Sequence, residues 1–128
     1  MKGRDDIESY LLRLDLPYEE IGQDTWMINS GQKDQNLVVR LAVPVAVFRC
    51  KIMDVPAQGR EELYRLLLEL NIADLLHGAY GIEGGAVVLS DALELENLDF
   101  NEFQATVEDM ALAVANHSSK LSKFQPKA

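Results

Sequence analysis

The sequence predicts an α+β domain in which helices pack on an antiparallel sheet. Apolar residues alternate with others from Leu37 to Val55, as in paired strands, and the flanking segments repeat apolar residues at helical spacing. The elements are expected in the order α-β-β-β-β-α-β-β-α. Because 128 residues are the size of one domain, we expect a single domain over residues 1–118, followed by a flexible basic tail over residues 119–128.

The first helix is predicted over residues 4–15. Its apolar residues recur at i, i+4 and i+7, which places three on one face: Ile7, Leu11 and Leu14. Asp5 and Glu8 have the spacing of a capping pair, and Pro17 prevents the helix from continuing. The next elements are short: strands over residues 18–22 and 25–30 and a polar loop over residues 31–36.

The strongest strand pattern lies in two segments that meet at Pro44. Successive side chains of a strand point to opposite faces. One face of the pair is therefore expected in the core: Val39, Leu41, Ala46, Phe48, Cys50 and Ile52. The other face is expected to point outward, away from the helices.

This outward face is the candidate partner-binding surface. It combines apolar and basic side chains: Val38, Arg40, Val47, Arg49, Lys51 and Met53. The chain has 12 Lys and Arg against 21 Asp and Glu, for a net charge of −9. Three bases on one face of such a chain favour the approach of an acidic or amphipathic peptide. The alternative is a solvated face whose bases pair with carboxylates such as Glu20 on a neighbouring strand.

A central helix over residues 58–74 carries two apolar stripes. The first, which ends at Asp74, is expected to pack on the sheet: Leu63, Leu66, Leu67 and Leu70. The second stripe requires another neighbour: Tyr64, Leu68 and Ile72. We therefore predict a homodimer interface at the second stripe. The alternative is that the N-terminal or C-terminal helix covers it.

Strands over residues 79–83 and 86–95 are predicted to form a hairpin, because Gly84 and Gly85 can adopt the positive φ angles of a tight turn. The glycines from Gly78 onward do not have the spacing of a dinucleotide fingerprint or a P-loop. Turn formation explains them better than phosphate binding does.

The last helix is predicted to begin after Asp99, which forms a capping box with Glu102, and to end at about Ser118. One face is apolar: Phe100, Phe103, Val107, Met110, Ala111 and Val114. His117 continues this face. A structural role is expected for it, and a position near the helix C-terminus would favour the imidazolium form.

Charge and composition exclude several classes of function. No Lys or Arg lies between Arg65 and Lys120, a stretch that contains ten Asp and Glu residues. Nucleic acids and anionic membranes attract clustered bases, so neither is an expected partner. The N-terminal residues do not resemble a secretory signal and no apolar run is long enough to span a membrane, so a cytoplasmic location is expected.

The sequence offers little chemistry for catalysis. Cys50 is interpreted as a buried apolar residue, and His77 is expected in a loop with a capping or solvated role. One cysteine and two isolated histidines predict no disulfide, metal site or cofactor. An enzyme that uses its many carboxylates is the third functional hypothesis, after a protein-binding module and an oligomeric structural or regulatory subunit.

Several segments resemble the YbjN-type family of bacterial domains, and the similarity extends from about Tyr10 to His117. It rests on helix-end, hairpin and aliphatic positions: Leu70–Asp74, Gly78–Ile82, Val87–Leu89 and Leu93–Leu95 with Leu98. The YbjN-type family in turn resembles the type III secretion chaperones that serve Tir and similar effectors.

This resemblance implies a chaperone-like or sensory-transduction regulatory protein without enzymatic activity. Type III secretion chaperones are small, acidic homodimers that hold segments of partner proteins. The resemblance therefore implies a protein or peptide partner, a homodimer and no cofactor, and it supplies no catalytic residue.

Overall fold

A computed structural model describes residues 1–29 and 36–125 and confirms the predicted fold class and element order. The bounds are α1 Arg4–Leu14, β1 Tyr18–Gly22, β2 Thr25–Asn29, β3 Asn36–Ala42, β4 Val45–Asp54, α2 Arg60–Ala73, β5 Ala79–Glu83, β6 Ala86–Glu94 and α3 Phe100–Ser122. A short 3₁₀ helix, Leu95–Asn97, precedes α3. Most of the predicted loop over residues 31–36 lies outside the described residues.

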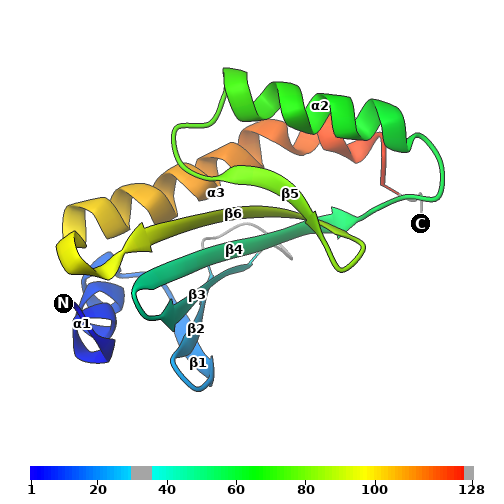
Figure 1. The fold of residues 1–128 in the computed structure, drawn as a ribbon. Helices are drawn as coiled ribbons and strands as arrows, with labels where there is room; N and C mark the ends of the chain where they lie inside the picture. Colours follow the sequence, from blue (N-terminus) through cyan, green and yellow to red (C-terminus); the bar gives the residue numbers. More distant parts are fainter. Residues whose placement is uncertain (30–35, 126–128) are drawn as a thin grey trace.

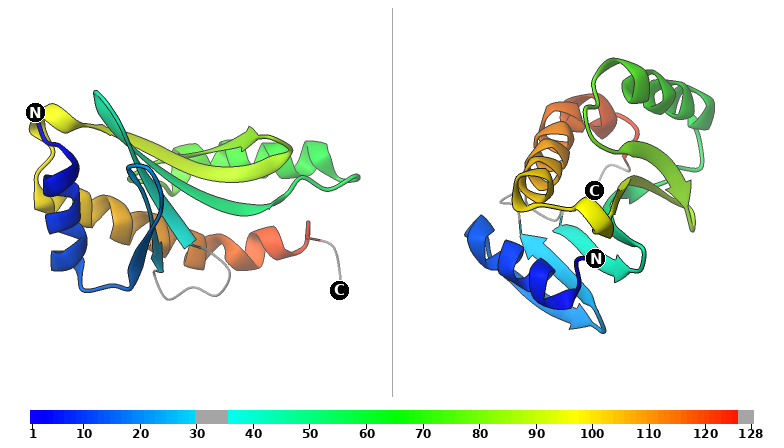
Figure 2. Two further views of the ribbon diagram at one scale, coloured as in Figure 1. Left: turned by 90° about the horizontal axis from the view of Figure 1, so that it is seen from below. Right: turned by 60° about the vertical axis from the view of Figure 1, so that its left-hand side comes forward.

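The six strands form one antiparallel sheet in the order β1-β2-β3-β4-β6-β5. Helices α1 and α3 cover one face of the sheet, and α2 lies beside α3 along β5 (Figures 1 and 2). Among the described residues, helices therefore cover one face of the sheet and leave the other uncovered; the uncovered face is called here the outer face. The hairpin between β5 and β6 turns through Gly84 and Gly85, which both have positive φ angles as predicted.

The core lies between the sheet and the helices. Its largest fully buried side chains are aromatic: Trp26, Phe48 and Phe103. The Phe48 and Phe103 ring centroids are 5.5 Å apart, and Tyr10 packs at the same distance from Phe103. The Tyr10 hydroxyl donates a hydrogen bond to the Leu98 carbonyl at 2.7 Å. These contacts join α1, β4 and α3 in a single core.

The start of α1 differs from the prediction. Gly3 is the N-cap, and its backbone N–H donates to the Asp6 carboxylate at 2.8 Å. The predicted capping pair was therefore wrong: the helix begins early enough to put Asp6 at the third position, and Glu8 forms an ion pair with Arg4 instead.

Helix α3 begins as predicted, since the Asp99 carboxylate accepts a hydrogen bond from the Glu102 N–H at 2.7 Å. It ends at Ser122, beyond the expected end near Ser118. Leu121 continues the apolar face and is buried, which keeps this last turn on the core. Of the predicted basic tail, residues 126–128 lie outside the described part of the chain.

Candidate protein-binding surfaces

The second stripe of α2 is exposed. The first stripe enters the core through Leu63, Leu67 and Leu70. On the other side of the helix, Tyr64, Leu68 and Ile72 are 36, 66 and 91% exposed. Neither α1 nor α3 covers this stripe, so the alternative that a helix of the same chain packs on it is wrong.

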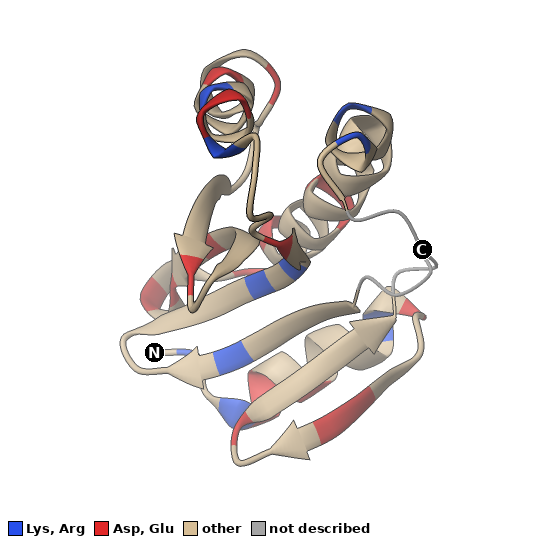
Figure 3. Cartoon of the chain, turned by 90° about the vertical axis from the view of Figure 1, so that its right-hand side faces the viewer, with Lys and Arg blue, Asp and Glu red and all other residues tan. Residues whose placement is uncertain are grey.

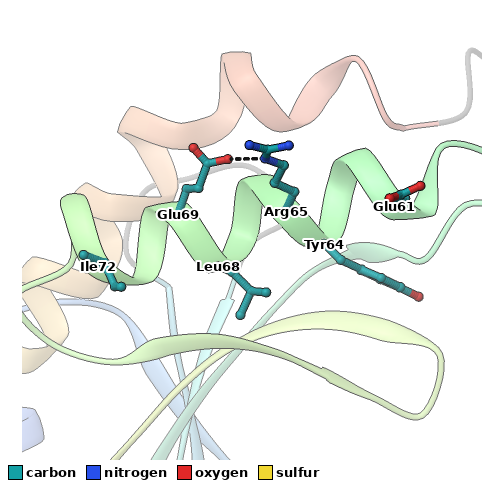
Figure 4. Close-up of a pocket in the computed structure, with 6 residues that line it drawn as sticks. All are labelled: Glu61, Tyr64, Arg65, Leu68, Glu69 and Ile72. Carbon is teal, nitrogen blue, oxygen red and sulfur yellow. Dashed lines mark hydrogen bonds and ion pairs between the residues drawn. The ribbon is translucent and has the colours of Figure 1, made fainter.

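These three residues form an apolar surface with a charged border. Together with Glu61, Arg65 and Glu69 they line a shallow hollow of about 660 Å³ (Figure 4). The Arg65 guanidinium forms an ion pair with Glu69 one helical turn further on, with 3.2 Å between Nε and Oε1. The charges of Arg65 and Glu69 are thus paired with each other, and the most exposed apolar side chains of this face are Leu68 and Ile72.

The outer face of the sheet carries most of the predicted partner-binding residues. Arg40 on β3 lies opposite Val47 on β4, and Val38 lies opposite Arg49. All four alternate with the buried Val39 and Phe48, so they share the face that lacks a helix. Figure 3 looks onto this face and shows the basic positions of β3 and β4 close together.

Met53 was placed on the wrong face by the sequence prediction. The pairing of β4 with β6 shifts between Lys51, opposite Val88, and Met53, opposite Val87. The extra residue of this bulge is Ile52, and it reverses the alternation that follows. Met53 is consequently buried in the core, and it does not belong to the outer face.

Two of the three outer-face bases have carboxylate partners. Arg49 Nη1 lies 2.6 Å from the Glu83 carboxylate of β5, and Lys51 Nζ lies 2.9 Å from Asp54. Glu20, the partner suggested from the sequence, forms its ion pair with Arg4 at 2.5 Å instead. Within the described residues, Arg40 is exposed and forms no ion pair.

A group of polar contacts fixes the end of α2, and sequence reasoning missed it. The Asn71 side chain bonds both backbone groups of Tyr80: it accepts from the N–H at 2.7 Å and donates to the C=O at 3.2 Å. These groups belong to an edge strand, so the amide occupies the place of a neighbouring strand. The alternation of β5 predicts that the Tyr80 side chain is buried. The sequence around Asn71 contains no signal that its side chain bonds to the Tyr80 backbone.

His117 extends this contact group to α3. Its Nδ1 lies 2.7 Å from the Tyr80 hydroxyl, and its Nε2 lies 3.6 Å from the Asp74 carboxylate. The ring is almost fully buried, and burial lowers the pKa of His117. The structural role is as expected, but the favoured imidazolium is not, because α3 continues past His117 and burial outweighs the attraction of Asp74.

His77 lies in the connection between α2 and β5. Its Nε2 is 3.3 Å from Asp109 of α3, and its Nδ1 is 3.9 Å from Asp91 of β6. The ring is partly exposed between two carboxylates, so it helps to hold the connection against α3.

The described residues contain no group of three or more His, Cys, Asp or Glu side chains arranged to hold a metal ion. Burial raises the pKa of the Cys50 thiol to about 11, which keeps it in the weakly nucleophilic thiol form. No helix among the described residues is long and apolar enough to cross a membrane.

The six-stranded antiparallel sheet with its helices matches the fold of type III secretion chaperones. The chain belongs to the CesT_Tir_1 family of type III secretion chaperones, whose family model matches residues 2–127. This membership confirms the predicted chaperone-like class. No curated protein matches the sequence significantly.

Solved structures agree with this assignment of the fold. A chain of the ExoU–SpcU heterodimer from the type III secretion system of Pseudomonas aeruginosa matches with a TM-score of 0.72 and 16% identity, covering 94% of this chain and 99% of that one. YbjN from E. coli matches with a TM-score of 0.69 and 13% identity over 93% of each chain. A chain of the ExsC–ExsE complex gives 0.63 and 17%, covering 100% of this chain and 99% of that one.

Proposed function

We propose that this protein is a cytoplasmic, non-enzymatic chaperone or regulator that binds a segment of a partner protein and acts as a homodimer. Its family supports the chaperone class. Structural neighbours include the HopA1–SchA chaperone–effector complex and the chaperone SycH bound to a fragment of YscM2. The single observation that carries the homodimer is the exposed apolar stripe of α2.

The spacing of the stripe suits a two-fold interface. Tyr64 and Ile72 lie four residues before and after Leu68. If two α2 helices cross antiparallel at Leu68, each Leu68 meets Leu68 of the partner subunit, and Tyr64 meets Ile72 of the partner subunit. Fully burying an exposed Leu or Ile side chain contributes about 1.5–3 kcal/mol, and Tyr64, which is only 36% exposed, contributes less. Together the six side chains give a total comparable to the association cost of about 4–15 kcal/mol, so adjacent contacts must also contribute.

The homodimer is tested by sedimentation velocity at tens of micromolar. We expect twice the chain mass of 14.3 kDa. Leu68→Glu should give the monomer mass, because the carboxylate would be desolvated in an apolar contact. Leu12→Glu on α1, where the side chain is 70% exposed, is the matched control and should remain a dimer. A monomeric wild type, or equal behaviour of the two variants, contradicts the interface.

The proposed partner site is the outer face around Val38, Arg40, Val47, Arg49 and Lys51, and its proposed occupant is an acidic or amphipathic segment. The argument is charge complementarity, since these bases lie together on a chain of net charge −9. The ion pairs of Arg49 and Lys51 are exposed and contribute only about 0–1 kcal/mol each. A carboxylate of the partner can therefore replace Glu83 or Asp54 at little cost.

The partner site is tested with Arg40→Glu combined with Arg49→Glu. The free energy of unfolding of the double variant should lie within about 2 kcal/mol of the wild-type value, because only exposed charges change. The double variant should nevertheless lose a partner that has been identified with the wild type. Lys2→Glu with Lys123→Glu changes the net charge equally and should retain that partner. If the outer-face variant binds with unchanged affinity and salt dependence, the outer face is not the site.

A second candidate function is an oligomeric structural or regulatory subunit, which the α2 stripe alone would serve. In a pull-down from a native lysate this candidate recovers only further copies of the chain. The chaperone proposal requires one defined protein that binds the purified dimer directly.

A further inference from the structure

Both histidines of the chain lie where the end of α2 meets the rest of the fold. His117 contacts Asp74, the C-cap of α2, and Tyr80 on β5. Tyr80 is in turn bonded through its backbone to Asn71 of α2. The last turn of α2 is thus attached to β5 and α3 through one chain of polar contacts, Asn71–Tyr80–His117–Asp74.

The geometry identifies which ring nitrogen of His117 carries the hydrogen in the neutral form. An ionised carboxylate only accepts hydrogen bonds, so Nε2, which faces Asp74, carries the hydrogen. Nδ1 is then the acceptor for the Tyr80 hydroxyl at 2.7 Å. Both Tyr80 and His117 are more than nine-tenths buried, so a polar atom of either side chain that loses its partner is poorly solvated.

Protonation of His117 disrupts this arrangement. The new hydrogen is on Nδ1, so the Tyr80 oxygen must accept and its own hydrogen loses its acceptor in a buried position. The groups that face the ring are Tyr80 from β5, Asp74 from the end of α2 and Lys120 from α3. Asp74 favours the imidazolium, whereas Lys120 and the burial of the ring oppose it, and burial dominates.

We infer that His117 is a pH-sensitive clasp that holds the last turn of α2, and with it the exposed stripe, in the position that dimerisation requires. This inference rests on the proposed dimerisation through α2. The neutral ring makes the contacts that hold this turn, and protonation of the ring weakens them. Because the stripe includes Ile72, between Asn71 and Asp74, loosening this turn changes the dimer surface directly.

The direction of the pH dependence follows from the linkage between proton binding and stability. Burial lowers the pKa of His117, so loosened and unfolded states bind the proton more tightly than the fastened state. The stability that these contacts give to the fastened state is fully present at a pH above the ordinary pKa of histidine. It is lost as the pH falls through the lowered pKa of His117. His77, which lies between Asp91 and Asp109 and outside this chain of contacts, serves as the comparison histidine.

The test compares wild type, His117→Asn and His77→Asn at about pH 8 and about pH 5.5, at constant ionic strength. Asn at position 117 offers an acceptor to Tyr80 and does not titrate. On acidification the dimer dissociation constant of wild type should rise at least about threefold. The rise should be absent in His117→Asn, and it should be present in His77→Asn.

Hydrogen exchange supplies a second readout that does not need the dimer. The protection factor of the Tyr80 amide, bonded to Asn71, should fall on acidification in wild type and not in His117→Asn. Should His117→Asn fail to fold, Tyr80→Phe removes the orphaned hydroxyl and should also weaken the pH dependence. If the wild type is monomeric, the proposed dimer is wrong, and the hydrogen exchange of the Tyr80 amide alone then tests the role of His117. Equal pH responses in wild type and the position-117 variant overturn the inference.

Discussion

Replacing Asn71 with Ala removes the two hydrogen bonds that join the side chain to Tyr80. A hydrogen bond contributes a net free energy of about 0.5–1.5 kcal/mol, so the two contribute about 1–3 kcal/mol. Ala is the better helix former and recovers up to about 0.7 kcal/mol. Asn71→Ala should therefore lower the free energy of unfolding by about 0.3–2.3 kcal/mol.

Asn116→Ala is the matched control for this prediction. Asn116 is exposed in the interior of α3 and forms no hydrogen bond within the described residues, so the same substitution should be neutral or slightly stabilising. Urea unfolding of both variants measures the difference, which should be about 1–3 kcal/mol. If Asn71→Ala is no more destabilising than Asn116→Ala, the edge of β5 does not depend on this amide.

Two further predictions test the core side of the sheet. Met53→Ala should lower the free energy of unfolding by about 2–5 kcal/mol, measured in urea, because the bulge buries this side chain. Val47→Ala, on the outer face of the same strand, should lower it clearly less. Equal losses for the two variants would mean that Met53 lies on the outer face. Cys50 should react with a thiol-specific reagent only as fast as the protein unfolds, because its thiol is buried and its pKa is raised to about 11; prompt reaction of the native protein contradicts this.

The sequence pattern predicts those parts of the fold that depend on local periodicity. Strand alternation correctly placed Val39, Phe48 and Cys50 inside and Arg40 and Arg49 outside, because a regular strand has no other way to arrange them. Two stripes on one helix correctly indicated that α2 has a face that its own fold does not cover.

Features that depend on pairing between distant segments were not predictable in this way. The bulge at Ile52 becomes visible only when β4 is aligned with β6, so period-two reasoning placed Met53 outside. Asn71, Tyr80 and His117 lie on three different elements, and each is a common residue in its own element. Similarly, the pairing of Arg49 with Glu83 depends on the sheet order, in which β5 is separated from β4 only by β6.

The two proposed surfaces differ in their distance from β5, and this determines whether they can be occupied together. The α2 stripe lies along the β5 end of the sheet, whereas Arg40 is on β3, three strand positions away in the order β5-β6-β4-β3. At about 4.8 Å per strand this separation is about 14 Å. A partner centred on Arg40 can therefore bind without displacing a second subunit, but one centred on Arg49 and Glu83 lies nearer to it. If partner binding requires the dimer, Leu68→Glu should weaken partner binding although it leaves the outer face unchanged. If the two surfaces act independently, Leu68→Glu should leave the affinity for the partner unchanged.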